Sequence, residues 1–258
     1  MKLYFKFVGI LLKSQMQYKA SFVMTAIGQF LISFTAFLSV YFMFFRFNSV
    51  NGYSFSEVLI CFSLVLMAYS ATECFARGFD LFSRLIQSGN LDRILVRPRG
   101  EIFQVLTSSI DFSRTGRLFQ SILILAYAIP TSGIIWEFDK IMTAVLMLIG
   151  GIAVFLSLFI LSAGVSFFTI EGIEFMNIFT DGSREFGKYP LSIYGEGILK
   201  FCTYVIPIAL FQYYPFLYLV GRSHNIALIF LPLLGFVFMV PCYAFFRFGL
   251  KRYKSTGS

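Results

Sequence analysis

Charged side chains are scarce in this chain of 258 residues. Asp, Glu, Lys and Arg together make up only 13% of it, whereas they make up roughly 25% of a typical soluble domain. Hydrophobic residues make up 58%, which is more than a water-soluble fold could hide from solvent. Since the apolar residues gather in long runs, the composition predicts an all-α integral membrane protein.

Patterns that hold metals or catalyse reactions are also missing. The chain has one histidine, His224, and four cysteines without a Cys-x-x-Cys pair, so neither a metal site nor a disulfide framework is indicated. It has no phosphate-binding loop, no nucleophile elbow, no zinc motif and no dinucleotide-binding glycine pattern. We therefore expect no catalytic residue and no cofactor on this chain. Energy for active transport would come from an ion gradient or from another subunit.

The net charge of +8 does not indicate nucleic-acid binding, because the basic residues flank apolar runs instead of forming one soluble patch. Of the 21 Lys and Arg residues, four lie in the N-terminal segment, seven in residues 77–117 and four at the C-terminal end. Only Arg46, Lys140 and Arg222 fall in loops expected on the opposite side. Because basic loops stay in the cytoplasm, both termini and residues 77–117 are predicted to be cytoplasmic.

Apolar runs predict the membrane spans. A span needs roughly 20 residues, and a further run, Ile198–Gly221, is broken by Pro207 and Pro215. Two cytoplasmic termini require an even number of spans, so we expect about six in a single membrane domain, residues 1–258. The uninterrupted runs are Phe22–Phe45, Val58–Phe75, Leu118–Trp136, Ile141–Phe168 and Ile226–Phe246.

The N-terminal residues 1–21 have a different pattern. Leu3, Phe7 and Ile10 recur at helical spacing between spread lysines, so we expect an amphipathic helix on the membrane surface.

Several charges lie close to the ends of the apolar runs. At the centre of a span each would cost roughly 2.5–3.5 kcal/mol. We therefore place Asp111, Arg114 and Arg117 in a cytoplasmic or interfacial extension of the third span. Glu73, near the inner end of the second span, is expected to pair with Arg77 one helical turn later.

A polar and basic segment, residues 77–100, separates the second and third spans, and we call it the insert. Its sequence predicts two short helices, divided at Ser88-Gly89-Asn90, where Gly and Asn tolerate a left-handed turn. Pro98 ends the second helix. We expect the two helices to expose an apolar and basic face, which would be a docking surface for a cytoplasmic partner. The apolar residues of this face are Phe79, Phe82, Leu85, Ile86, Leu91, Ile94 and Leu95.

Three segments carry a family resemblance. Ile86–Pro98 resembles the isoleucine, glycine, leucine-aspartate, leucine, arginine-proline segment of ATP-binding-cassette (ABC) exporter permeases of the type-2 class. Tyr189–Tyr194 and the two proline motifs that end at Pro207 and Pro215 are a second match, and the tail Arg247–Ser258 is a third. The resemblance covers nearly the whole chain and is strongest to the uncharacterised or multidrug-type branch.

The resemblance implies a multi-pass permease subunit of an ABC exporter in a bacterial cytoplasmic membrane. Such permeases have about six spans, an N-terminal interfacial helix and a cytoplasmic coupling helix between spans two and three, here within residues 77–117. Besides membrane lipid, their partners are a second permease, identical or paralogous, and separately encoded ATPase subunits that bind ATP and Mg²⁺. The ATPase-coupling residues implied are Ser88, Gly89, Leu91, Asp92, Leu95, Arg97 and Pro98.

The polar tract 169–188 has two interpretations. Hydropathy makes it a cytoplasmic loop, with Ile198–Gly221 as the fifth span. The resemblance makes it a polar fifth span, followed by an outer re-entrant pair of short helices in residues 189–215. Intramembrane carboxylates usually face a water-filled pathway. The second interpretation therefore gives Glu171, Glu174, Asp181 and Arg184 as translocation-pathway candidates, with Arg184 as an ion-pair partner.

The same carboxylates leave an alternative function open. An ion-coupled secondary transporter could use Glu171, Glu174 and Asp181 as proton relays. The inverted repeat that such carriers usually contain is not visible in the sequence.

Overall fold

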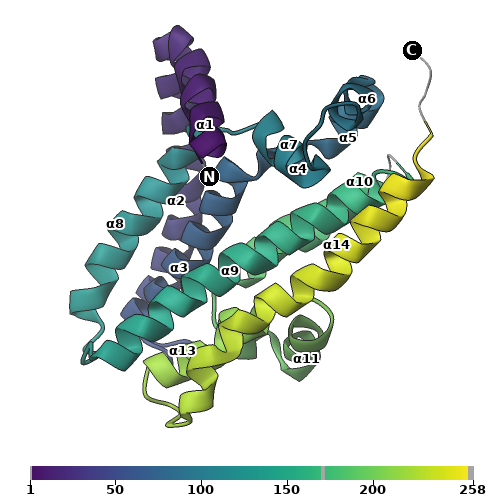
Figure 1. Cartoon of the computed structure of the whole chain (residues 1–258). Coiled ribbons are helices and arrows are strands. Elements are labelled where there is room, and N and C mark those ends of the chain that lie inside the picture. Colours follow the sequence, from purple (N-terminus) through teal and green to yellow (C-terminus); the bar gives the residue numbers. More distant parts are fainter. Residues whose placement is uncertain (1, 170–171, 255–258) are drawn as a thin grey trace.

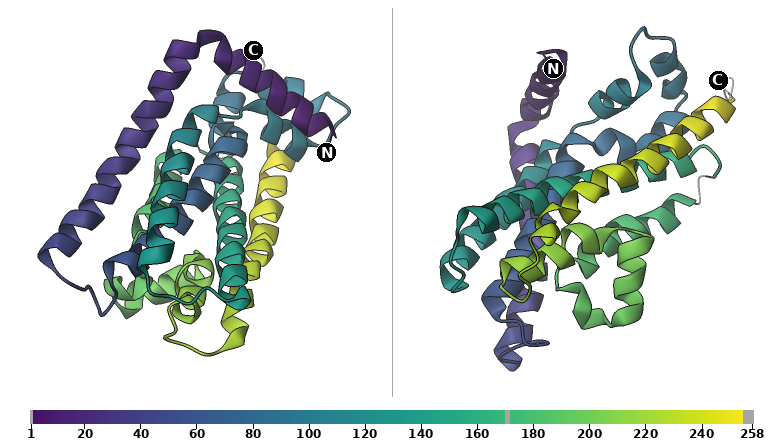
Figure 2. Two further views of the ribbon diagram at one scale, coloured as in Figure 1. Left: turned by 90° about the vertical axis from the view of Figure 1, so that its left-hand side faces the viewer. Right: turned by 60° about the horizontal axis from the view of Figure 1, so that its bottom comes forward.

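The computed structural model describes residues 2–169 and 172–254 (Figure 1). The described residues are mainly helical, and a single β-bridge among them joins Val50 to Tyr53. The longest helices pack side by side in one bundle (Figure 2, left). They are α2 (Lys19–Arg46), α3 (Phe55–Phe75), α8 (Thr115–Thr131), α9 (Phe138–Val165) and α14 (Leu234–Arg252).

Helix α3 is the centre of the bundle. A capping box begins it: Ser54 Oγ accepts a hydrogen bond from the Glu57 N–H at 3.3 Å, and Glu57 accepts one from the Ser54 N–H at 2.7 Å. In an apolar stretch of 18 residues of α3, 83% is buried in the protein, whereas only 11% is buried in the corresponding stretch of the N-terminal segment that includes α2. Helices α8 and α9 both pack on α3, and α14 packs on α9. Polar groups on α3 therefore meet protein rather than lipid.

In the part of the chain that the structure describes, four helical segments are long and apolar enough to cross a membrane: Leu3–Arg46, Phe55–Phe75, Phe138–Val165 and Ile226–Arg252. A fifth is present if the bent pair Glu196–Tyr204 and Ile208–Leu219, whose axes meet at 89°, is one broken span. Helix α8 has only 17 residues. Length and apolarity alone therefore do not reproduce the six expected spans. Helix α8 is short, and the chain between α9 and Ile226 is polar or bent.

The N-terminal helix packs against one end of the bundle, over the buried cluster of Cys74, Ile110 and Phe112. Helix α1 (Lys2–Gln15) and the 3₁₀ turn η1 (Met16–Tyr18) precede α2, and α1 lies across the end of the bundle (Figure 2, left). The Gln15 side chain accepts a hydrogen bond from the Phe112 N–H at 3.0 Å. A first helix is present, and the break between it and α2 lies at residues 16–18.

The insert forms the short helices α4 (Arg77–Asp80), α5 (Phe82–Gln87) and α6 (Asn90–Leu95). The left-handed turn is confirmed, since Gly89 has φ 66°. The expectation of an exposed apolar face is wrong for most of its residues. Phe79, Phe82 and Leu91 are at most 1% exposed, and the Phe82 ring packs 5.3 Å from that of Phe246 on α14. The bundle itself covers this face, because burying aromatic rings there removes a large apolar area from water.

The polar tract 169–188 contains one helix, α10 (Gly172–Phe186), which packs on α9 and α3. A bent pair of helical segments follows. Its first arm is α11 (Glu196–Tyr204), and its second arm is made of two short consecutive helices, α12 (Ile208–Phe211) and α13 (Tyr213–Leu219). They lie at the end of the bundle opposite the insert (Figure 1). The bent pair is compatible with both interpretations of the sequence, a broken fifth span and a re-entrant segment.

Helix α4 approaches helix α7 (Glu101–Ser108) very closely. A Cβ atom on Gly78 would lie 1.9 Å from the Val105 carbonyl oxygen and 2.6 Å from Ser108 Oγ. A side chain at this position therefore cannot be accommodated unless the two helices separate.

We expect Gly78→Ala to lower the free energy of unfolding by about 1–3 kcal/mol, as overpacking usually does. Gly100→Ala is the matched control, because nothing lies within 4 Å of a Cβ at Gly100. Thermal unfolding in detergent can be followed with a thiol-reactive dye, since all four cysteines are free and buried. Equal unfolding midpoints for the two variants would contradict the close approach of α4 and α7.

Candidate functional site

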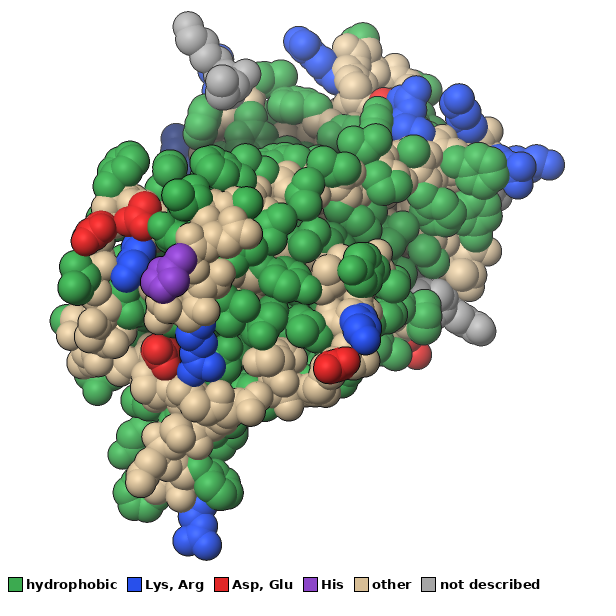
Figure 3. Space-filling view, turned by 90° about the horizontal axis from the view of Figure 1, so that it is seen from below, with side chains coloured by type: hydrophobic (Ala, Val, Ile, Leu, Met, Phe, Trp, Pro, Cys, Tyr) green, Lys and Arg blue, Asp and Glu red, His purple; other side chains and the backbone are tan. Residues whose placement is uncertain are grey.

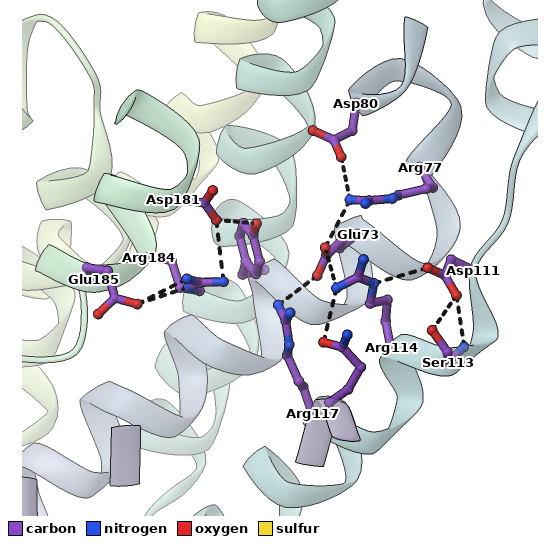
Figure 4. Close-up of polar contacts among 12 residues, drawn as sticks. Glu73, Arg77, Asp80, Asp111, Ser113, Arg114, Arg117, Asp181, Arg184 and Glu185 are labelled. Atoms are coloured by element: carbon purple, nitrogen blue, oxygen red, sulfur yellow. Dashed lines mark hydrogen bonds and ion pairs between the residues drawn. The ribbon is translucent and has the colours of Figure 1, made fainter. Parts of the chain in front are cut away.

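The densest group of charged side chains surrounds Glu73, at the end of α3 (Figure 4). Glu73 is only 3% exposed. Its Oε1 accepts a hydrogen bond from Arg77 at 3.0 Å and lies 3.1 Å from Arg114 Nη1. Its Oε2 accepts from Arg117 Nη1 at 2.9 Å. One carboxylate thus binds arginines of α4, α8 and the 3₁₀ turn η2 (Phe112–Arg114).

Only part of this arrangement follows from the sequence. The i, i+4 pair of Glu73 with Arg77 is confirmed. The sequence did not indicate that Arg117 is buried: it is 7% exposed and lies within the protein. Its charge is tolerated there because Glu73 neutralises it, so the cost of isolated insertion does not apply.

Two of the arginines contact a second carboxylate. Arg77 forms an ion pair with Asp80. Arg114 Nε lies 3.1 Å from Asp111 Oδ2, and Arg114 Nη1 donates to Gln29 Oε1 at 3.0 Å. Since Gln29 is on α2, the network extends to the least buried of the four candidate spans.

Asp111 is held in its ionised form. Burial raises its pKa, but hydrogen bonds from Ser113 and Arg114 and the charge of Arg114 outweigh burial, so the pKa lies below its usual value. The Ser113 N–H donates to Asp111 Oδ1 at 3.0 Å, and the Ser113 hydroxyl donates to the same atom at 2.6 Å. Asp111 is therefore a fixed counter-charge for Arg114.

Helix α10 brings a second charged group to the same region. Arg184 Nη1 lies 3.4 Å from Asp181 Oδ1, so the expected pairing of these residues is confirmed. The Tyr69 hydroxyl of α3 donates to Asp181 Oδ1 at 2.9 Å. The Arg184 guanidinium lies 4.9 Å from the centre of the Tyr69 ring, a cation–π contact. Tyr69 therefore links α10 to α3.

A cavity of about 530 Å³ lies between the Glu73 and Asp181 groups, and we call it the arginine cavity. It is built from α3, the insert, η2, α8 and α10. Its lining is mainly polar. The lining residues are Tyr69, Glu73, Arg77, Asp80, Leu81, Ser83, Arg84, Arg114, Arg117, Asn177, Thr180, Asp181 and Arg184.

The pathway candidates of the sequence are divided by this geometry. Asp181 and Arg184 line the arginine cavity. Glu174 is exposed on α10 and does not line it. Glu171 lies outside the described residues. The sequence interpretation missed the role of Glu73, Arg114 and Arg117 as partners. The only sign of this partnership in the sequence is that charged residues recur near the ends of successive apolar runs.

The coupling candidates lie around the turn between α5 and α6 and at the end of α6. Leu91 is buried and positions α6 from within, so a partner cannot touch its side chain. Gly89 and Asp92 are half-buried. Ser88, Leu95, Arg97 and Pro98 are exposed.

Comparison with known protein families gives a match over residues 30–257 to the family described as ABC-2 family transporter protein. The chain belongs to the ABC-2 transporter family. No curated protein and no solved structure matches it. ABC-2 membrane proteins are the membrane channel components of ABC transporters and are not themselves catalytic. Membership therefore identifies this chain as a multi-pass membrane permease whose family works with ABC ATPases.

The geometry of this ABC-2 chain agrees with a binding role. In the parts that the structure describes, no group of three or more His, Cys, Asp or Glu side chains is arranged to hold a metal ion. The charged residues are instead arginines and carboxylates in contact, which bind ions or polar ligands by charge-assisted hydrogen bonds.

We expect Glu73→Gln to destabilise the protein by about 3–5 kcal/mol, because three arginines would lose their shared counter-charge in a buried site. Glu196→Gln is the matched control, since Glu196 is highly exposed and pairs only with exposed Lys200; it should change stability by less than about 1 kcal/mol. Thermal unfolding in detergent measures both. A Glu73→Gln variant as stable as the Glu196→Gln variant would contradict the role of Glu73 in joining the helices.

Proposed function

We propose that this ABC-2 chain is the permease subunit of an exporter in a bacterial cytoplasmic membrane. In this proposal it forms the translocation pathway and binds no cofactor, while separately encoded ATPase subunits bind ATP and Mg²⁺. The observation that carries the proposal is the exposed end of α6. Leu95 and Val96 are 38% and 84% exposed, and Arg97 follows them, in the segment that resembles a coupling helix.

The surface next to this end suits a protein partner. Arg97 and Arg99 flank a groove of about 280 Å³, and Leu3, Phe7 and Phe103 supply its apolar surface. Exposed apolar side chains beside guanidinium groups favour a partner that presents apolar residues beside carboxylates. We assign this groove and the end of α6 to the ATPase.

Buried contacts would carry a movement of α6 into the bundle. Leu91 and Ile94 belong to the same core as Phe155 and Phe159 of α9. The insert also follows α3 directly after Ala76, and Arg77 binds Glu73. In our proposal, closure of the ATPase pair moves the insert as a lever, and these contacts tilt α3, α8 and α9 toward an outward-open state.

We also propose six spans, namely α2, α3, α8, α9, α10 and α14, with cytoplasmic termini. At 1.5 Å per residue, α8 is about 26 Å long and α10 about 22 Å, which is short for a core of about 30 Å. Their packing on α3 supports the assignment, because a polar short helix is tolerated when protein surrounds it. The bent pair α11–α13 would be the outer re-entrant segment. Figure 3 shows this end of the bundle with many hydrophobic side chains, interrupted by several charged side chains and a histidine.

The resemblance further supports a second permease, identical or paralogous, as a partner. The alternative of an ion-coupled carrier has less support. Asp181 is engaged by Arg184 and Tyr69, and Glu174 lies on an exposed surface. A proton relay would need carboxylates that are free to exchange protons along a path.

Docking can be tested at the exposed end of α6 with the double variant Val96→Asp/Arg97→Glu. We expect co-purification with the proposed partner ATPase, and hydrolysis stimulated by the permease, to fall at least about tenfold, because an apolar contact is lost and a guanidinium charge is reversed. The measurement is affinity capture followed by ATP hydrolysis in reconstituted vesicles.

The matched control is Ile135→Asp, a change at an equally accessible aliphatic residue (72% exposed) in the loop between α8 and α9. It should leave capture and hydrolysis unchanged. If the double variant captures as much ATPase as this control does, α6 is not the docking element.

Energy coupling separates the exporter from the carrier. We expect transport in membrane vesicles to stop when ATP is depleted and to continue when the ion gradient is collapsed by an uncoupler. The opposite pattern would reject the exporter and favour the carrier.

A further inference from the structure

The arginine cavity contains more cationic than anionic side chains. Five arginines line it: Arg77, Arg84, Arg114, Arg117 and Arg184. The lining carboxylates are Glu73, Asp80 and Asp181. Asp111, bound to Arg114 from behind, adds one more negative charge. Glu185 contacts Arg184 but is itself neutralised by Lys188. One positive charge therefore remains without a counter-charge.

Two of the arginines have unused hydrogen-bonding capacity. Arg117 is more than nine-tenths buried, and its Nε has no hydrogen-bond partner among the described residues. Arg84 is exposed at the cavity and forms no ion pair with any residue that the structure describes. A buried guanidinium N–H without an acceptor is costly, so an acceptor from outside the chain would stabilise this arrangement.

The arginines converge from distant parts of the sequence. Arg77 and Arg84 come from the insert, Arg114 and Arg117 from the start of the third span, and Arg184 from α10. Carboxylates balance four of the five charges, so one positive charge remains uncompensated in a space from which water is partly excluded. An anion placed between the arginines would neutralise this charge.

Guanidinium groups favour one class of anion in particular. Their planar fork of N–H donors matches the oxygens of a phosphate group. The volume of about 530 Å³ lies in the usual range for a small-molecule site. A smaller hollow adjoins it: Arg117 and Arg184 line both, and Phe62, Leu66 and Ala36 give this hollow an apolar side.

We propose that the arginine cavity binds a phosphate-type anionic group and that the cargo of the exporter carries such a group. The part about cargo rests on the proposed function, whereas the binding site does not. The phosphate would come from a soluble phosphorylated molecule or from the headgroup of an anionic lipid. In either case Arg84 meets it first, and Arg117 and Arg184 hold it at the inner wall.

The test measures binding to the purified full-length protein, without ATP and without ATPase. Inorganic phosphate is titrated at constant ionic strength against chloride, and the unfolding midpoint is recorded. In a second arm, the protein is placed in phosphatidylcholine vesicles with or without phosphatidylglycerol. We expect saturable stabilisation by phosphate if the source is soluble, or by phosphatidylglycerol alone if the source is a lipid headgroup.

Arg84→Gln is the main variant, because Arg84 supports no contact on which folding depends. We expect its apparent affinity for the stabilising probe to fall about tenfold, the effect of one charge-assisted contact. Arg184→Gln should have at least the same effect. The matched control is Arg46→Gln, an exposed arginine at the opposite end of α2, which should retain the wild-type affinity.

Two outcomes would overturn the site: no saturable stabilisation by either probe, or equal affinities for Arg84→Gln and Arg46→Gln. Failure of the exporter proposal looks different. ATPase capture that is unaffected by Val96→Asp/Arg97→Glu would reject docking at α6 while phosphate-type binding persisted.

Discussion

The structure depends on one buried carboxylate, that of Glu73, which is shared by three arginines. It lies at the point where the most buried of the candidate spans, α3, ends and the insert begins. Through Arg117 it holds α8, and through Arg114 it reaches Gln29 on α2. A single anion with three cationic partners is tolerated in a low-dielectric interior only if all of them stay in contact. The inner ends of these helices are therefore constrained to move together.

This constraint attaches the insert firmly to the helices of the bundle. Its apolar side chains are part of the bundle core, and Arg77 belongs to the carboxylate group, so the insert is bound to the helices on two sides. The end of α6, where Val96 is 84% exposed, and the groove beside Arg97 and Arg99 are the surfaces that we propose for a partner. A force applied there would reach α3 through ionic contacts and α9 through aromatic packing.

Much of the fold could be predicted from the sequence, because hydropathy and turn chemistry are local. The apolar runs predicted the long helices to within a few residues at most ends, and Gly89 predicted the turn between α5 and α6. The insert has three short helices and not the two expected, since the chain also breaks at Leu81. The candidate site was only partly predictable. Glu73 with Arg77 and Asp181 with Arg184 are neighbours within single turns, whereas Arg117 reaches Glu73 across 44 residues. Burial of Phe79 and Phe82 was missed because the covering helix, α14, is the last in the chain.

The sharing of Glu73 also has a consequence for biogenesis. When α3 leaves the ribosome, only Arg77 accompanies this carboxylate, and Arg117 is synthesised 44 residues later. At 5–20 residues per second this delay is roughly 2–9 s. During that time α3 carries an acidic group whose full complement of partners does not yet exist. In the six-span arrangement that we propose, α3 would therefore wait at the translocation machinery and enter the lipid together with α8, as a hairpin already joined by its ion pairs.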